Sequence, residues 1–174
     1  MTSTPLPDHV CSILIDVPVE DVWNEITKTG SIQRPLYNTV LDIDLQPGGR
    51  LRYSSPDRKR VFVAGEVLEV DPPRRLQHTY IFAMRPEPPT VVTWELEPVQ
   101  TGTRVTLTHA GWTSEHTDPH KHEAGWNEIL GLLKSELETG DMPGRTKLVY
   151  RLQSLFLFAM PKTTKREYVD EQGW

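Results

Sequence analysis

The residues best suited to chemistry in this chain are two histidines, His78 and His109, in segments whose residue types are typical of β-strands. Alternation of apolar and polar residues places both on the apolar face of their strands. An imidazole can act as an acid or base near neutral pH, and aromatic walls with a few polar groups are typical of ligand pockets. The other pocket residues that we expect are Tyr80 and Phe82 on the strand of His78, Trp94 on the strand 91–97 and, just beyond the last strand, Trp112.

Two interpretations of these inward residues are open. They could contact a ligand, or they could be packed core residues whose imidazoles bond to the backbone. A cyclase, dehydratase or hydrolase using His78 or His109 with Tyr80 is an alternative function. The sequence has neither a nucleophile elbow nor paired acidic groups in an obvious cleft, so we assign no catalytic residue and favour binding over catalysis.

Three further histidines, His116, His120 and His122, lie near the carboxylates of Asp118 and Glu123. Imidazoles and carboxylates together could bind a transition metal. However, residues two apart on a helix point about 200° away from each other, so His120 and His122 cannot chelate one ion without help. We therefore predict neither a metal nor a cofactor. We expect His122, four residues before Trp126, to face the mouth of the pocket.

One long amphipathic helix is predicted over Asp118 to Gly140. Asp118 offers an N-cap oxygen, Pro119 suits the first helical position, and Gly140 suits a left-handed end. The apolar residues recur at spacings of three and four, so they share one face that must cover a partner. That stripe comprises Trp126, Ile129, Leu130, Leu133 and Leu137. We expect Trp126 and Leu130 to line the pocket.

Most of the chain before this helix reads as strands and turns. A first strand over His9 to Asp16 precedes a helix that begins at Pro18 and ends at Gly30. The segment Ser31 to Leu36 is expected to be a short helical or irregular crossover. Paired glycines at Gly48 and Gly49 indicate a hairpin turn and not a phosphate loop, because no helix follows them. Further strands are predicted over 37–45, 50–55, 61–70, 76–83, 91–97 and 103–109.

Several short motifs occur in an order that resembles a known family. Val19-Glu-Asp-Val-Trp23 opens the first helix, and Pro47-Gly-Gly-Arg50 makes the hairpin. The segments Gly65 to Pro73 and Gly102 to His109 follow, and then Gly125-Trp126. Over roughly residues 9 to 140 this pattern is similar to bacterial relatives of the C-terminal domain of the heat-shock-protein-90 ATPase activator. That family lies within the START/Bet v 1-like (SRPBCC) superfamily.

The resemblance implies an α+β helix-grip fold in residues 1–140. A curved antiparallel sheet of about six to seven strands would wrap around the long C-terminal helix, with an internal pocket between them. Members of the superfamily commonly bind lipids, hormones or polyketides, and some act as cyclases. A chaperone-linked interaction role is a further alternative, although the eukaryotic co-chaperone also uses a separate N-terminal domain for which this chain has no room.

Residues 141–174 form a C-terminal extension that the family pattern does not cover. We predict an apolar helix from Thr146 to Met160, ended by Pro161. Its large apolar side chains would each forgo roughly 1.5–3 kcal/mol of burial if left in water. The helix must therefore cover its own domain, contact a second copy through residues 145–160, or lie on a membrane surface, which we consider the least favoured of the three.

Composition narrows the function further. The chain has 174 residues and a net charge of -5, which disfavours nucleic-acid binding. A lone cysteine, Cys11, cannot form an internal disulfide, and the N-terminus lacks a secretory signal, so we expect a cytoplasmic location. The prediction is a small-molecule binding protein whose pocket takes an apolar or aromatic ligand.

Overall fold

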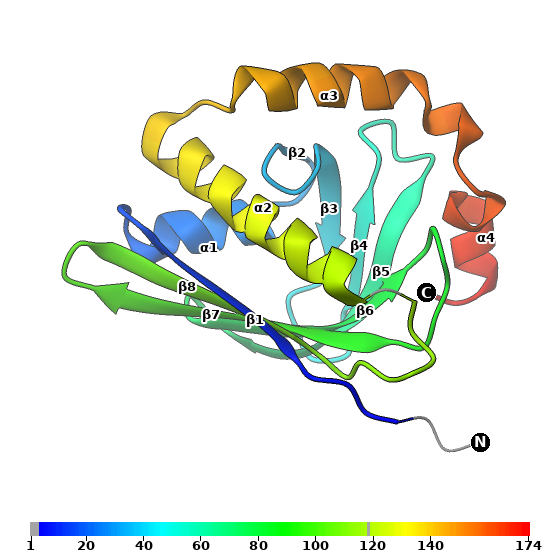
Figure 1. Ribbon diagram of the computed structural model, residues 1–174, viewed down its shortest axis with the longest axis horizontal. Helices are drawn as coiled ribbons and strands as arrows, with labels where there is room; N and C mark the ends of the chain where they lie inside the picture. The colour runs from blue at the N-terminus through cyan, green and yellow to red at the C-terminus, as the bar shows by residue number, and fades with distance from the viewer. Residues whose placement is uncertain (1–3, 118) are drawn as a thin grey trace.

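The computed structural model describes residues 4–117 and 119–174 and contains one eight-stranded antiparallel sheet (Figure 1). The strand order is β1-β8-β7-β6-β5-β4-β3-β2. Seven strands overlap the predicted segments, and the eighth is a two-residue edge strand where a short helical or irregular crossover was expected. The strands are β1 (His9–Ile15), β2 (Ile32–Gln33), β3 (Thr39–Ile43), β4 (Arg50–Ser54), β5 (Val61–Asp71), β6 (Arg75–Phe82), β7 (Thr90–Val99) and β8 (Gly102–Ala110).

Two helices pack against the inner face of this curved sheet. Helix α1 (Val19–Thr27) and the long helix α2 (Pro119–Thr139) bury their apolar stripes in the same core cluster as the inner strand residues. The arrangement is a helix-grip fold, as predicted. Gly140 has a φ of +71° and ends α2 in the left-handed conformation expected. Asp118, the predicted cap, lies outside the described residues.

The core lies between α2 and the middle strands. Leu133 is fully buried, and Trp126 and Leu130 are nearly so. Trp94 of β7 packs edge-on against Trp126, with ring centroids 5.9 Å apart. Such edge-to-face pairs place the positive ring edge against the negative face, which adds to the burial of two large apolar surfaces. The predicted stripe of α2 is therefore the face that the sheet holds.

The turn between β3 and β4 requires glycine. Gly48 has a φ of +83°, and a Cβ atom at Gly49 would lie 2.0 Å from the carbonyl oxygen of Asp44. Only a residue without a side chain permits this approach. The paired glycines therefore form the predicted hairpin turn.

The C-terminal extension contains two helices with different surroundings. Helix α3 (Gly144–Leu155) runs across the top of the molecule in Figure 1, and α4 (Arg166–Glu171) lies beside β5. Two single-turn 3-10 helices, Leu157–Ala159 and Lys162–Thr164, connect them. Val169 of α4 is fully buried against Val61 and Ala64, and Arg52 pairs with Asp170 at 2.6 Å. The end of the extension is thereby anchored on the sheet.

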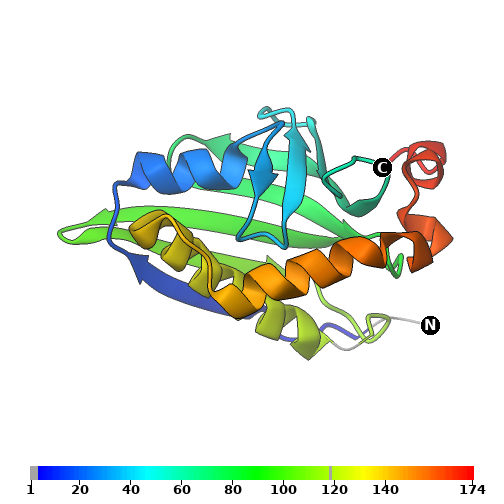
Figure 2. The same ribbon diagram turned by 90° about the horizontal axis from the view of Figure 1, so that it is seen from above.

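Helix α3 lies along the outside of the domain (Figure 2), and none of its residues is buried. The Tyr150 hydroxyl donates a hydrogen bond to the Arg34 carbonyl oxygen at 3.0 Å, whereas Leu148, Leu152 and Leu155 are 50–65% exposed. The stripe therefore does not cover its own domain. Contact with a second copy through residues 145–160 stays a prediction. None of the described helices combines the length and apolar character needed to cross a membrane.

Matched leucine truncations test this placement of the two helices. Leu133→Ala in α2 should lower the free energy of unfolding by about 2–5 kcal/mol, because it opens a cavity in the core. Leu152→Ala in α3 should lower it by less than about 0.5 kcal/mol, because the side chain is already in water. Urea denaturation at two protein concentrations measures both changes. A large, concentration-dependent loss for Leu152→Ala would instead place a second copy on α3.

Candidate functional site

His109 sits at the centre of a buried hydrogen-bond chain that joins α2 to the sheet. The indole Nε1–H of Trp126 donates to His109 Nδ1 at 2.8 Å. Since the indole can only donate, Nδ1 accepts, and the neutral ring carries its proton on Nε2. That proton faces the Thr90 hydroxyl at 2.7 Å, and the hydroxyl donates to the Tyr80 carbonyl oxygen at 3.2 Å. Both nitrogens of His109 are therefore engaged.

Burial keeps His109 neutral. It lowers the pKa from 6.5 to about 2, with smaller contributions from His122 and other histidines. The backbone carbonyl of His109 also accepts the indole N–H of Trp112 at 2.9 Å. A neutral ring without a free nitrogen cannot exchange a proton with a ligand, so the geometry of His109 is that of a residue that positions Trp126 and Trp112.

The aromatic residues predicted for the pocket do lie together. The rings of Tyr80, Trp112, Trp126 and His122 all approach that of His109, with centroids 4.3–5.8 Å apart. Phe82 contacts His122 at 5.5 Å, and Trp94 joins the group through Trp126. Leu130 is buried in the same core. The contact of these residues with a ligand stays a prediction.

The inner face also carries a buried polar atom, on His78, without a hydrogen-bond partner among the described residues. His78 is buried on β6, and its Nδ1–H donates to the Thr79 carbonyl oxygen at 2.7 Å. Its Nε2 is therefore an acceptor, and it has no hydrogen-bond partner among the described residues. Burial lowers the pKa of His78 to about 4, so the ring is neutral at physiological pH.

Two tyrosines also belong to this inner face. The Tyr80 side chain lies on β6, two residues from His78, and Tyr53 lies buried on the inner side of β4. Burial raises the pKa of both, so both remain protonated donors. Tyr53 is absent from our predicted set, although its alternation with Leu51 in the predicted strand 50–55 places it on the apolar face.

A small hollow opens at the start of α2, next to these rings. Its volume is about 10 Å³, and it is lined by Tyr80, Phe82, Glu87, Pro88, Thr90, Trp112, His116 and His122. His116 bridges the two loops at its rim. Its Nε2 lies 3.0 Å from the Pro88 carbonyl oxygen, and its Nδ1 accepts the Thr113 N–H at 3.0 Å. The Thr117 N–H also donates to Glu87 at 3.1 Å, so these bonds hold the hollow closed.

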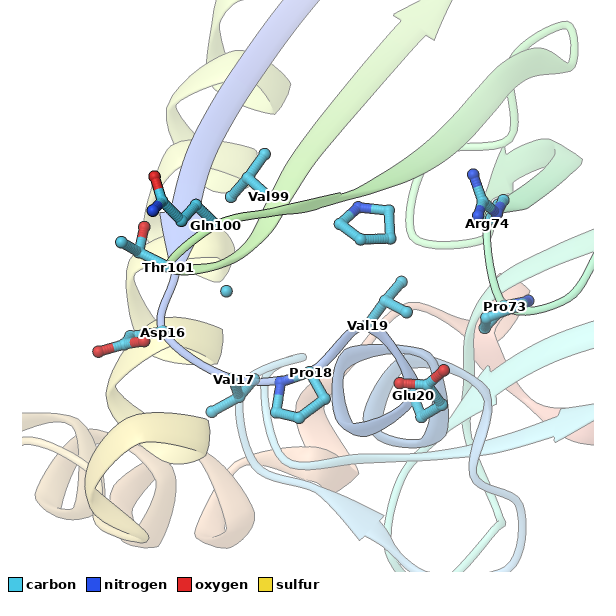
Figure 3. A pocket seen from close by; sticks show the side chains of 12 residues that line it. Asp16, Val17, Pro18, Val19, Glu20, Pro73, Arg74, Val99, Gln100 and Thr101 are labelled. Carbon is cyan, nitrogen blue, oxygen red and sulfur yellow. The ribbon is translucent and has the colours of Figure 1, made fainter.

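A larger cleft of about 570 Å³ lies at a separate set of turns, shown in Figure 3. Its wall comprises the β1–α1 connection, the β5–β6 turn and the β7–β8 hairpin. Val19 and Val99 contribute apolar surface, whereas Glu20 and Arg74 contribute charge (Figure 3). This cleft was not predicted, because turns distant in the sequence form it and no motif marks them.

Comparison with protein families gives one match that spans most of the chain. A family model described as "Activator of Hsp90 ATPase homolog 1-like protein" matches residues 16–138. No curated protein matches the chain.

Solved structures share the fold at low sequence identity. The protein MLL2253 from Mesorhizobium loti is 24% identical with a TM-score of 0.64, over 78% of this chain and 100% of that one. CalU16 from Micromonospora echinospora is 21% identical with a TM-score of 0.61, over 90% and 92%. DynU16, from the dynemicin biosynthetic locus, is 23% identical with a TM-score of 0.64, over 79% and 49%. At these identities the similarity shows the fold alone.

The buried histidines predict how stability depends on pH. The folded-state pKa of His78 lies below its ordinary value of 6.5, so the unfolded chain binds protons more readily. The contribution of neutral His78 to the free energy of unfolding is fully present above pH 6.5. It is lost as the pH falls from 6.5 toward about 4. In that range, each such histidine should lower the free energy of unfolding by about 1.4 kcal/mol for each pH unit of acidification. Urea denaturation measures the free energy of unfolding at about pH 7.5 and about pH 5.5. Between these two values, His78→Phe should lose less of that free energy than the wild type does. An equal loss in both proteins would contradict a neutral, buried His78.

Proposed function

This chain belongs to the Activator of Hsp90 ATPase homolog 1-like family, within the START/Bet v 1-like superfamily, and from that premise we propose that it binds a small molecule between α2 and the sheet. The ligand is apolar or aromatic and carries a hydrogen-bond donor such as a hydroxyl. The observation that carries the proposal is the buried Nε2 of His78, which has no hydrogen-bond partner among the described residues and lies on the same inner face as Tyr53 and Tyr80.

Buried polar atoms without partners are costly to a fold. Leaving one unsatisfied costs about 1–3 kcal/mol, and most such atoms in proteins have a partner. His109 shows that this fold can satisfy a buried imidazole completely. A ligand hydroxyl donating to His78 Nε2, with tyrosine hydroxyls around it, would remove the cost. The surrounding rings would supply the apolar wall.

Ligand entry requires the hollow beside α2 to open. Its volume of about 10 Å³ is that of roughly one water, whereas small-molecule sites span about 300–1,000 Å³. The bonds from His116 to Pro88 and from Thr117 to Glu87 close its rim. We place the mouth between these two loops, where breaking a few polar contacts exposes Tyr80, Phe82 and His122 without disturbing the sheet.

Binding, and not catalysis, is the proposed activity. Both nitrogens of His109 are engaged, and His78, with a pKa of about 4, is a weak base. General acid–base catalysts work best with a pKa near the operating pH. The similarity to DynU16, a protein of a biosynthetic locus, extends to the fold and leaves this assignment unchanged.

Ligand capture followed by matched tyrosine substitutions tests the proposal. The purified protein, incubated with a metabolite extract of its source organism, should retain one small molecule per chain in native mass spectrometry. Tyr80→Phe and Tyr53→Phe should each weaken binding of that molecule by about 2- to 10-fold, the value of one hydrogen bond. Isothermal titration measures the affinities.

Two variants serve as controls. Tyr150→Phe makes the same chemical change on α3, where the hydroxyl donates to the Arg34 carbonyl oxygen, and should leave the affinity unchanged. Val99→Trp narrows the cleft at the β7–β8 hairpin and should also have no effect. Loss of binding in Val99→Trp would show that the ligand binds in that cleft instead. A wild-type protein that retains no small molecule would overturn the proposal.

A further inference from the structure

We propose that His9, His120 and Glu123 form a binding site for a divalent transition-metal ion, with Zn²⁺ as the preferred ion. One nitrogen of each imidazole and one carboxylate oxygen lie within 4.8 Å of one another. His9 begins β1, whereas His120 and Glu123 lie in the first turns of α2. The site is independent of the proposed small-molecule function.

The donor set matches the chemistry of zinc. Two imidazoles and one carboxylate occur as the protein ligands of zinc, with a water at the fourth position. Bonds of about 2.0–2.2 Å in a tetrahedron place ligand atoms about 3.3 Å apart. His120 Nδ1 and Glu123 Oε2 are already 3.8 Å apart, because residues three apart lie on one side of a helix. The His120 side chain is 85% exposed, so little packing opposes the remaining adjustment.

The burial of His9 distinguishes this cluster from a chance group of exposed side chains. Its side chain is only 7% exposed, and its Nδ1 is buried without a hydrogen-bond partner among the described residues. Its ring is stacked against that of His120, with centroids 6.1 Å apart and an interplanar angle of 20°. A metal ion bound through Nδ1 would satisfy a nitrogen that otherwise carries the full cost of burial.

The fold supplies a third metal ligand, His9, which α2 alone does not contain. His120 and His122 diverge as expected, and the ring of His122 instead contacts those of Tyr80 and Phe82. Pairing of β1 with β8 sets His9 opposite His109, beside the start of α2. An ion at this position would join β1 to α2 and brace the helix end that borders the hollow.

Zinc titration of the full chain tests the site. Protein treated with a chelator and then dialysed should bind one Zn²⁺ per chain in isothermal titration. His120→Ala and Glu123→Gln should each weaken binding by more than about 10-fold, because loss of a ligand exceeds the effect of losing an outer-shell partner. Both residues are at least partly exposed, so these variants should fold, and circular dichroism verifies that.

Two neighbouring substitutions are the controls. His122→Ala removes an imidazole and Glu115→Gln a carboxylate in the same region, and both should bind Zn²⁺ as the wild type does. Co²⁺ in place of Zn²⁺ should give visible absorption bands that His120→Ala abolishes. Absence of zinc binding by the wild type would overturn the site, as would an unchanged affinity in His120→Ala and Glu123→Gln. A loss in His122→Ala equal to that in His120→Ala would assign the ion to the helix histidines instead.

Discussion

The chain of hydrogen bonds through His109 is the interaction on which the arrangement of this protein depends. Trp126 of α2 donates to one ring nitrogen, and the other faces the hydroxyl of Thr90 on the neighbouring strand β7. Apolar packing alone is non-directional and would tolerate a small rotation or shift of the helix. The hydrogen bonds remove that freedom, because any shift would leave a buried imidazole unsatisfied. Thus α2 has one position on the sheet.

The buried polar residues fall into two groups according to whether their hydrogen-bonding atoms have partners. His109 and His116 have both ring nitrogens in hydrogen bonds, so they hold strands, helix and loops in place. His78 keeps one buried acceptor, Nε2, without a partner among the described residues, and Tyr53 and Tyr80 lie on the same face. His78 thus differs from His109, because one of its buried ring nitrogens lacks a hydrogen-bond partner among the described residues.

Much of this organisation could be predicted from the sequence, because it follows from short-range periodicity. Alternation placed His78, Tyr80 and His109 on the inner face, and a spacing of three and four residues identified the buried stripe with Trp126. Periodicity cannot show which nitrogen bonds to what, so the structural role of His109 required the fold. Nor can it show pairs that meet through tertiary contacts, such as His9 with His120. The outward stripe of α3 was likewise unpredictable, because Val169 of α4, not α3, packs on the sheet.

Nitrogen-15 NMR of the histidine rings tests the central claim most directly. Two-dimensional spectra that correlate ring nitrogens with ring protons distinguish the two neutral tautomers from the charged form. The account predicts that His109 carries its proton on Nε2 and that its nitrogen shifts stay constant from about pH 7.5 to about pH 5, since burial holds its pKa near 2. A His109 ring that titrates near its ordinary pKa of 6.5, or that carries its proton on Nδ1, would contradict the account.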